Sequence, residues 1–454
     1  MPDRDLLCDS PQLTDLYQLT MLQGYLDCDM HQQATFEFFV RKLPDNRNFL
    51  LAAGLEQLLD FLECARFSDA ELDYLAGSGF FRQNLIDYLA QYRFTGAVHA
   101  LPEGVLFFGN EPLVRITAPL PQAQLIETRL INLLQLPVMI ASKAARCRMV
   151  AGDAQLVDFG LRRAHGAEAG LHAARAAYIG GFDGTSNVLA GQRFGIPIFG
   201  TMAHSFIQAH DSELAAFRAF AESHPDNLVL LIDTYDTERG ARRVVQLADE
   251  LASTGVRIKA VRIDSGELGD EARRVRSILD AAGHPDIGIF ASSSVDEYLI
   301  RSLVKRDVPI GGYGVGTHLT TSADAPYLNC AYKLEEYDGQ PRRKRSSGKA
   351  TWPGRKQLYR YLDESGLLRF DRLCTEDEMD SGGTALLQPV MENGQRLQSP
   401  ESLDHIRERV RDQLSMLPAP FRDLDEQATP LLQISDALQQ LAVETDRLSN
   451  GGSG

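Results

Sequence analysis

A strand that leads into a helix is predicted for residues 258–283, whose sequence is IKAVRIDSGELGDEARRVRSILDAAG. The apolar run IKAVRID, residues 258–264, has the composition of a buried strand. Polar residues follow it, with Ser265 in the position of a helix cap, and Gly283 is a helix stop signal. The stretch therefore predicts one β-α unit.

The same unit recurs through the middle of the chain. A short apolar run is followed each time by a polar cluster and a helical segment, at residues 154–160, 195–200, 228–233, 286–290 and 308–314. Because strands that alternate with helices usually lie parallel in one sheet, the repeated pattern predicts an α/β fold.

Length and composition narrow the classes of protein. A chain of 454 residues is too long for one ordinary core, so we expect two or three domains. Its 46 basic and 62 acidic residues give a net charge of −16, which disfavours nucleic acid or an anionic membrane as a partner. An anionic substrate would therefore need arginines that are concentrated locally.

The cysteines and the N-terminus favour a cytoplasmic protein. Neither a signal-peptide pattern nor an apolar run long enough to span a bilayer is recognised in the sequence. The six cysteines are scattered and show no metal-ligand spacing, so we expect small buried hydrophobic side chains in a reducing compartment. They are Cys8, Cys28, Cys64, Cys147, Cys330 and Cys374.

Side chains with chemical functions gather where the predicted strands end. In parallel sheets and barrels, the carboxyl ends of the strands form the ligand site. Taken singly, each side chain has a plainer interpretation: the aspartates as helix caps, the first arginine as a surface ion pair, the histidine as a half-buried hydrogen-bonded residue. Their recurrence at one structural position favours a site. The residues are Phe159, Arg162, Thr201, His204, Asp233, Arg262, Asp264, Ser292, Ser293, Gly314, Gly316 and Thr317.

This set of residues suits a phosphorylated sugar and a flat acid. Glycine-rich backbone at a helix N-terminus, as in the turn GYGVGT, binds phosphate through its N–H groups. Two aspartates can hold Mg²⁺ together with substrate phosphates, or hydrogen-bond a ribose or an amide. An aromatic ring beside arginines can stack on a planar anion while a guanidinium binds its carboxylate.

Several motifs resemble those of the nicotinate phosphoribosyltransferase family. The similarity runs in order from about residue 14 to about residue 360. The motifs are TDLYQLTM (14–21), DFGLRRAHG (158–166), GGFDGTSNVLAG (180–191), GTMAHSF (200–206), VRIDSGEL (261–268), GVGT (314–317), AYKLEEYDG (331–339) and KRSSGKATWPGRKQ (344–357).

The resemblance implies a fold, a reaction and an assembly. The fold would be an irregular, TIM-barrel-like α/β barrel of the type II phosphoribosyltransferases, with a second α/β domain built from both ends of the chain. Residues 1–130 and 326–454 would form that domain, with a flexible tail at 449–454, and residues 131–325 the barrel. Nicotinate, 5-phosphoribosyl 1-diphosphate (PRPP), ATP and water would become nicotinate mononucleotide, diphosphate, ADP and phosphate, in a homodimer whose active site lies at the subunit interface.

Roles are implied position by position. ATP would phosphorylate His204, which Asp233 or Asp264 would orient, and Asp264 would contact the ribose or Mg²⁺. Tyr17, accompanied by Asp15, would reach across the dimer and stack on the pyridine ring opposite Phe159. The remaining implied contacts are Arg162, Thr201, Ser205 and Arg262 around nicotinate, Gly314, Gly316, Thr317, Ser292 and Ser293 around PRPP, and Lys344 and Lys349 near ATP or diphosphate.

Other interpretations stay open. Nicotinamide phosphoribosyltransferase has an aspartate for the amide where GTSNVLAG has Ser186, which favours the acid as substrate. A catalytically silent nucleotide-binding regulator on the same fold is the alternative from another class. The basic stretch 341–356 also suits a solvated loop, and Tyr17 suits a core aromatic on a helix.

Overall fold

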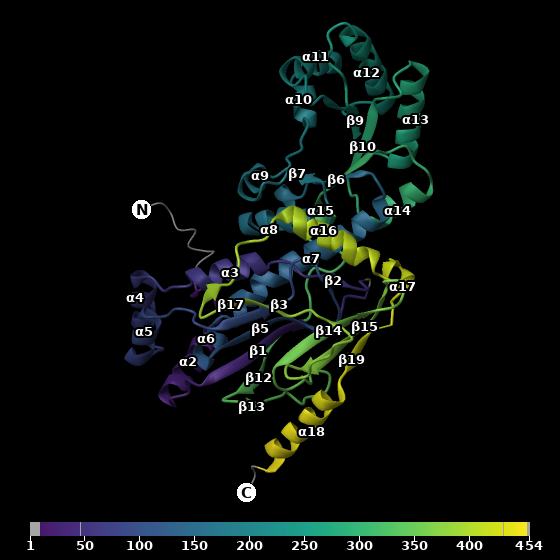
Figure 1. Cartoon of the computed structure of the whole chain (residues 1–454). Helices are drawn as coiled ribbons and strands as arrows, with labels where there is room; N and C mark the ends of the chain where they lie inside the picture. Colours follow the sequence, from purple (N-terminus) through teal and green to yellow (C-terminus); the bar gives the residue numbers. More distant parts are fainter. Residues whose placement is uncertain (1–9, 46, 430, 452–454) are drawn as a thin grey trace. The chain divides into compact units, whose positions relative to one another are not determined.

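The computed structural model describes residues 10–45, 47–429 and 431–451, without the side chains of residues 449–451 (Figure 1). The sequence expectations for Cys8 and for residues 452–454 of the tail lie outside this range. The chain divides into two compact units, one formed by residues 1–139 and 327–454 and the other by residues 140–326. The boundary between residues 139 and 140 falls inside helix α7, Glu127–Ala151.

Both ends of the chain build the first unit. Its seven-stranded sheet has the order β13-β12-β1-β5-β3-β17-β18, and every pairing in that order is antiparallel. N-terminal strands therefore pair directly with C-terminal ones, which confirms a second domain built from both ends. The strands are β1 (Gln33–Val40), β3 (Ala97–Ala100), β5 (Pro112–Pro119), β12 (Cys330–Tyr337), β13 (Gln340–Pro341), β17 (Gln388–Glu392) and β18 (Gln395–Arg396).

Smaller sheets and helices complete this unit. The four-stranded sheet comprises β14 (Lys356–Leu362), β15 (Leu368–Thr375), β16 (Thr384–Ala385) and β19 (Leu432–Ile434), and the two-stranded one β2 (Leu50–Leu51) and β4 (Leu106–Phe107). The helices are α2 (Leu16–Asp27), α3 (Leu55–Cys64), α4 (Asp69–Gly77), α5 (Gln83–Ala90), α6 (Leu120–Leu125), α16 (Leu403–Ser415), α17 (Ala419–Arg422) and α18 (Asp436–Gly451).

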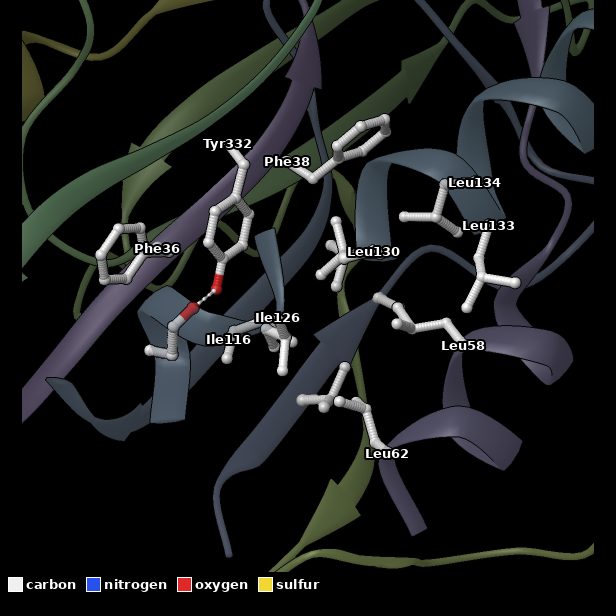
Figure 2. Close-up of a cluster of buried hydrophobic side chains, with 14 of the residues drawn as sticks. Phe36, Phe38, Leu58, Leu62, Ile116, Ile126, Leu130, Leu133, Leu134 and Tyr332 are labelled. Atoms are coloured by element: carbon white, nitrogen blue, oxygen red, sulfur yellow. Dashed lines mark hydrogen bonds between the residues drawn. The ribbon is translucent and has the colours of Figure 1, made fainter. Parts of the chain in front are cut away.

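The core of this unit forms where one face of the sheet meets helices α3 and α7. Phe36 and Phe38 are alternate residues of β1, so they lie on the same face and belong to the core. Figure 2 shows them beside leucines of both helices. Tyr332 stacks on Phe36 with ring centroids 4.9 Å apart, and its buried hydroxyl donates to the Ala123 carbonyl at 2.8 Å. The hydrogen bond satisfies the one polar atom of that side chain.

The second unit contains a six-stranded sheet in the order β7-β6-β11-β10-β9-β8. All its pairings are parallel, as the β-α pattern predicts. The strands are β6 (Gln155–Asp158), β7 (Gly184–Thr185), β8 (Val229–Leu231), β9 (Ala260–Ile263), β10 (Gly288–Ser292) and β11 (Gly312–Val315). The helices are η1 (Leu161–Arg163), α8 (Ala167–Ile179), α9 (Val188–Phe194), α10 (His204–Gln208), α11 (Glu213–Ser223), α12 (Thr237–Leu251), α13 (Leu268–Ala281), α14 (Glu297–Lys305) and α15 (Thr317–Thr320).

Two local expectations in this unit are wrong. The run at 195–200 forms only an isolated bridge, between Ile198 and Thr185, instead of a strand. Helix α13 begins after Glu267, so Ser265 does not cap it. Ser265 instead donates its hydroxyl proton to Asp233, which is a tertiary contact that local sequence does not reveal.

Whether a cysteine is buried depends on its position in its helix or strand. Cys147 and Cys374 are buried as expected, whereas Cys28 and Cys64 are exposed because they stand at the ends of helices α2 and α3. No disulfide joins the five cysteines in the described part of the chain. Within that part, every helix is too short or too polar to cross a membrane.

Candidate functional site

A cavity of about 210 Å³ lies at the carboxyl ends of strands β6, β9, β10 and β11. Most of the side chains that the sequence places at strand ends line it. The lining consists of Phe159, Arg162, Arg163, Arg262, Asp264, Ser292, Ser293, Ser294, Gly314, Gly316 and Thr317. Three arginines and a glycine-rich turn in so small a space give the cavity a cationic character that suits anionic ligands.

Arg262 is fixed by contacts on every side of its guanidinium. It donates to the hydroxyls of Thr201 and Ser292, each at 3.0 Å, and lies 3.4 Å from the Asp264 carboxylate. Its guanidinium carbon also lies 5.5 Å from the centroid of the Phe159 ring. Arg262 therefore holds one side of that ring, and Thr201 acts on the cavity through Arg262.

Two glycines of β11 make room for aromatic rings. A Cβ atom on Gly314 would lie 2.5 Å from the Phe159 ring, and one on Gly312 would lie 2.6 Å from the Phe290 ring. The two rings are neighbours, with centroids 5.9 Å apart. The alternation of glycine along GGYG thus allows the rings to pack against the strand, which a side chain at either position would prevent.

The two aspartates form one network, and neither caps a helix. Asp233 Oδ2 accepts hydrogen bonds from the Asp264 backbone N–H at 2.7 Å and from the Ser265 hydroxyl at 2.6 Å. Asp264 Oδ1 accepts from the Ser292 hydroxyl. The cap of helix α12 is Asp236, so the helix-cap interpretation of Asp233 is wrong. Both carboxylates are held by side chains and backbone from neighbouring strand ends.

His204 begins helix α10 beside this network. Its Nδ1 lies 3.1 Å from Thr234 Oγ1, and its Nε2 lies 3.8 Å from Asp264 Oδ2. The side chain is 40% exposed, so solvent and a bound ligand can reach the ring. The half-buried, hydrogen-bonded geometry of the plainer interpretation is present, but it occurs next to the Asp264 carboxylate.

The residues fit a magnesium ion that arrives with a substrate phosphate. Asp233 Oδ1 is buried, and the described side chains leave it without a hydrogen-bond partner. Over the same described residues, no group of three or more His, Cys, Asp or Glu side chains forms a metal cluster. Because Mg²⁺ commonly takes one or two carboxylates and completes its shell with phosphate and water, Asp233 and Asp264 would suffice as protein ligands.

The backbone beyond strand β10 has an uncommon conformation. Ser293 and Ser294 have φ angles of 90° and 49°, in the left-handed region that non-glycine residues seldom occupy. Both residues line the cavity. Such strain is retained most often at functional sites, and here it shapes the wall next to the glycine-rich turn, because Ser292 pairs with Gly314.

Asp158 fixes the loops on the other side of Phe159. Its buried carboxylate accepts from the Gly160 N–H at 2.8 Å and from the Thr185 hydroxyl at 2.7 Å. Burial raises the pKa of this carboxyl group, and the two hydrogen bonds oppose that shift. The backbone carbonyl of Asp158 also accepts the Ser186 N–H at 2.8 Å, so one residue positions the segments around Phe159 and Ser186.

Other predicted residues lie outside the cavity lining. Ser205 is exposed on helix α10. Tyr17 lies on helix α2 of the first unit and is 49% exposed, so its interpretation as a core aromatic is wrong. Lys344 and Lys349 lie in an exposed loop of the same unit, where the Lys344 carbonyl accepts the Thr351 N–H at 3.0 Å.

Three residues of the site were not predicted from the sequence. Arg163 and Ser294 line the cavity, and Thr234 contacts His204. Each is the chain neighbour of a predicted residue at a strand end. Arg162, Ser293 and Asp233 were predicted because they follow the ends of predicted strands. The same criterion, extended by one residue along the chain, would have included these three residues.

The comparisons with known proteins agree with this geometry. Residues 13–135 match the nicotinate phosphoribosyltransferase N-terminal domain, and residues 154–338 match the nicotinate phosphoribosyltransferase family. The chain is 48% identical over 414 residues to nicotinate phosphoribosyltransferase pncB2 of Mycobacterium tuberculosis, which covers 91% of this chain and 89% of the relative. It is 43% identical over 360 residues to the nicotinate phosphoribosyltransferase of Bacillus subtilis, covering 78% and 73%.

Solved structures show the same fold. The crystal structure of human nicotinic acid phosphoribosyltransferase superposes with a TM-score of 0.86 at 30% identity, covering 95% of this chain and 99% of the human one. Nicotinate-nucleotide pyrophosphorylase from Pyrococcus furiosus gives a TM-score of 0.74 at 25% identity, covering 92% and 97%. The expected α/β fold is confirmed, and the chain belongs to the nicotinate phosphoribosyltransferase family.

Proposed function

We propose that the chain is a nicotinate phosphoribosyltransferase, which joins nicotinate to the ribose of PRPP and releases diphosphate. The observation that carries the proposal is the cavity at the strand ends, where Phe159 and Arg162 lie beside a glycine-rich turn. Family membership and 48% identity to a relative of that name support the same activity.

Different residues of the cavity bind the two substrates. Phe159, held by Arg262, offers a face for the pyridine ring, and Arg162 binds the nicotinate carboxylate. The backbone from Gly314 to Thr317, with Ser292 and Ser293 at the end of the neighbouring strand, binds the phosphates of PRPP. The ring nitrogen then attacks C1 of the ribose while the bond to diphosphate breaks, and the electron pair leaves with the diphosphate.

We propose that Mg²⁺ and ATP assist this reaction. Mg²⁺, held by Asp233 and Asp264, would neutralise the charge of the departing diphosphate. ATP would phosphorylate His204, whose ring is half exposed and has its two nitrogens beside Thr234 and Asp264. A neutral imidazole nitrogen is a competent phosphoryl acceptor, and hydrolysis of the phosphohistidine would couple ATP to synthesis. Lys344 and Lys349 would act near ATP or diphosphate.

We further propose a cytoplasmic homodimer in which Tyr17, with Asp15, completes the site of the other subunit. Leu13, Leu16 and Tyr17 are each more than 40% exposed on one segment of the first unit. Exposed apolar groups of this kind often mark contacts with another chain. Asp15 accepts a hydrogen bond from Thr128 at 2.9 Å, which fixes the start of helix α2 and hence the base of Tyr17.

An assay of substrate choice tests the proposed function. Purified protein is incubated with PRPP and labelled nicotinate, with and without ATP, and with nicotinamide as the competing substrate. Because Arg162 requires a carboxylate and Ser186 replaces the aspartate that would receive an amide, nicotinate should be preferred by several orders of magnitude in kcat/KM. Comparable values for the two substrates would favour the nicotinamide enzyme, and no turnover of either would favour a silent regulator.

A further inference from the structure

A buried network of charged side chains joins helices α7 and α14 in the second unit. The Lys143 ammonium lies 2.7 Å from Glu297 Oε2, and Arg146 Nε lies 3.1 Å from Glu297 Oε1. Lys143 also lies 2.7 Å from Asp324 Oδ1, which belongs to the turn after helix α15. These four residues lie outside the lining of the strand-end cavity, so they can act on a ligand there only through other residues.

The network is almost completely withdrawn from water. The side chains of Lys143 and Arg146 are each 2% exposed, and that of Glu297 is 0% exposed. Burial disfavours the charged form of Lys143, but the Glu297 and Asp324 carboxylates outweigh it and raise the pKa of the ammonium. Burial likewise disfavours the charged form of Glu297, but Lys143 and Arg146 outweigh it and lower the pKa of that carboxyl group. Both groups are therefore charged near neutral pH.

Stability alone gives little reason for such a network. Moving charges out of water is costly, and apolar side chains of similar volume often stabilise a protein at least as well as a buried ion pair. What an ion pair adds is a fixed geometry, which can select one conformation of the chain. The function of Lys143 therefore depends on which segments it joins.

Glu297 lies at the end of the first segment. Strand β10 ends at Ser292 and helix α14 begins at Glu297, so residues 293–296 connect them. In this connection Ser293 and Ser294, which line the cavity, have the left-handed φ angles of 90° and 49°. A strained backbone persists only where its surroundings hold it in place. The carboxylate of Glu297, paired through both oxygens, holds the far end of this connection.

Asp324 lies at the end of the second segment. Strand β11 leads through Gly316 into helix α15, and both Gly316 and Thr317 line the cavity. The Ala323 N–H donates to the His318 carbonyl at 3.1 Å. The residue before Asp324 is thus bonded to the residue after Thr317, so a displacement of Asp324 would be passed on to the cavity wall.

We infer that Lys143 is a positioning residue, which fixes the spacing of the two segments that bind the phosphates of PRPP. The pairing of β10 with β11 ends at Ser292 and Gly314. Beyond that pair, Lys143 joins the two segments through one ion pair to each. This role rests on the proposed function, in which Ser293 and Thr317 contact PRPP. A misplacement of about 1 Å can cost about a hundredfold in activity, so loss of the link should weaken PRPP binding measurably.

Binding of PRPP tests this role directly. Calorimetry with PRPP and Mg²⁺, in the absence of nicotinate and ATP, measures the affinity without turnover. Lys143→Met keeps most of the length of the side chain and removes its charge, so we expect PRPP to bind about tenfold more weakly or worse. The KM for PRPP should rise by the same factor, while the KM for nicotinate should change by less than about twofold.

Asp324→Asn tests the same link more mildly, since this side chain is 10% exposed and the amide keeps an oxygen for Lys143. We expect a smaller loss of PRPP affinity, and this variant decides the question where Lys143→Met does not fold. The double variant should bind PRPP no more weakly than Lys143→Met, because one link can be broken only once. Losses that add would assign the two residues independent roles and would contradict the inference.

A matched control separates position from stability. Arg243 lies 2.8 Å from the Glu213 carboxylate, which is 0% exposed, and both residues belong to the same unit but lie outside the cavity lining. Arg243→Met should lower the Tm without changing the affinity for PRPP. Equal losses of affinity in Arg243→Met and Lys143→Met would overturn the inference, as would unchanged affinity in both Lys143→Met and Asp324→Asn. A wild type that neither binds PRPP nor uses nicotinate would contradict the proposed function itself, and the role of Lys143 with it.

Discussion

The role that we propose for His204 depends on the side chains around it. Its imidazole is held between Thr234 Oγ1 at 3.1 Å and the Asp264 carboxylate at 3.8 Å, while two fifths of the side chain stays exposed. A purely structural histidine would gain little from exposure. A phosphoryl acceptor needs it, because ATP has to approach the nitrogen from solvent.

The proposed phosphorylation of His204 can be measured directly. Incubation with γ-labelled ATP and Mg²⁺ should leave an acid-labile, base-stable label, and His204→Ala should abolish it. The variant should keep a slow synthesis that ATP does not stimulate, because departure of diphosphate with Mg²⁺ does not need the phosphohistidine. Because the side chain is 40% exposed, the free energy of unfolding should change by less than about 1 kcal/mol. A label retained on His204→Ala would remove His204 from the mechanism.

Arg162 and Arg163 are adjacent cations with different expected roles. Both line the strand-end cavity, and the family resemblance assigns the nicotinate carboxylate to Arg162. Removing a charged hydrogen-bond donor costs about 1.5–3 kcal/mol, so Arg162→Ala should raise the KM for nicotinate by about tenfold or more. The KM for PRPP should change less. Arg163→Ala is the matched comparison, and the opposite ranking of the two KM values for Arg162→Ala would assign Arg162 to the phosphates.

At the scale of the element, strand β11 depends on its glycines. Gly314→Ala would place a methyl group 2.5 Å from the Phe159 ring and 3.1 Å from the Phe290 ring. The ring of Phe159 would have to move away from its contact with Arg262, so we expect nicotinate binding to weaken and stability to fall by about 1–3 kcal/mol. Steady-state kinetics and thermal unfolding measure both effects.

Gly311→Ala is the control in the same strand region. Its Cβ would meet only the Ile289 carbonyl oxygen, at 3.9 Å, so neither kinetics nor stability should change appreciably. Equal effects of the two substitutions would show that backbone conformation, and not space for Phe159, explains the glycine at position 314.

Hydrophobic pattern predicted most elements of the second unit because each strand is a short apolar run beside a periodic helix. The predicted run 258–264 contains β9, and the run 228–233 contains β8. The run at 195–200 failed because apolar composition alone does not distinguish a strand from a loop that pairs at one residue, Ile198. The prediction that both chain ends build one domain came from the family resemblance, because local sequence patterns carry no information about the pairing of distant strands.

The candidate site was predicted better than its internal contacts. Strand-end position located Phe159, Arg262 and Asp264, which line one cavity. The hydrogen bond from Ser265 to Asp233 was not predictable, because a serine before a helix has the same local sequence whether or not it caps that helix.

At the scale of the whole molecule, the proposed dimer can be tested by mixing variants that each lack ATP-stimulated synthesis. Tyr17 and His204 belong to different units of the chain. If Tyr17 completes the site of the other subunit, a heterodimer of Tyr17→Ala and His204→Ala contains one site with both groups intact. Neither homodimer contains such a site. Co-expression with two affinity tags allows the heterodimer to be isolated and its ATP-stimulated synthesis to be compared with both parents.

The heterodimer should recover up to about half of the activity per wild-type dimer, because one of its two sites is intact and the other lacks both groups. Random exchange of subunits would convert half of the heterodimer into the two parent homodimers and so halve the recovered activity. The tagged heterodimer therefore has to be assayed before exchange occurs. A control mixture of His204→Ala with Asp264→Ala should recover no ATP-stimulated synthesis, since these two side chains lie 3.8 Å apart in one chain and each heterodimer site would lack one of them. Activity in that control would show exchange of whole units between subunits. Inactivity of the Tyr17 and His204 heterodimer, with its dimeric state verified by size, would place both residues in the site of a single chain.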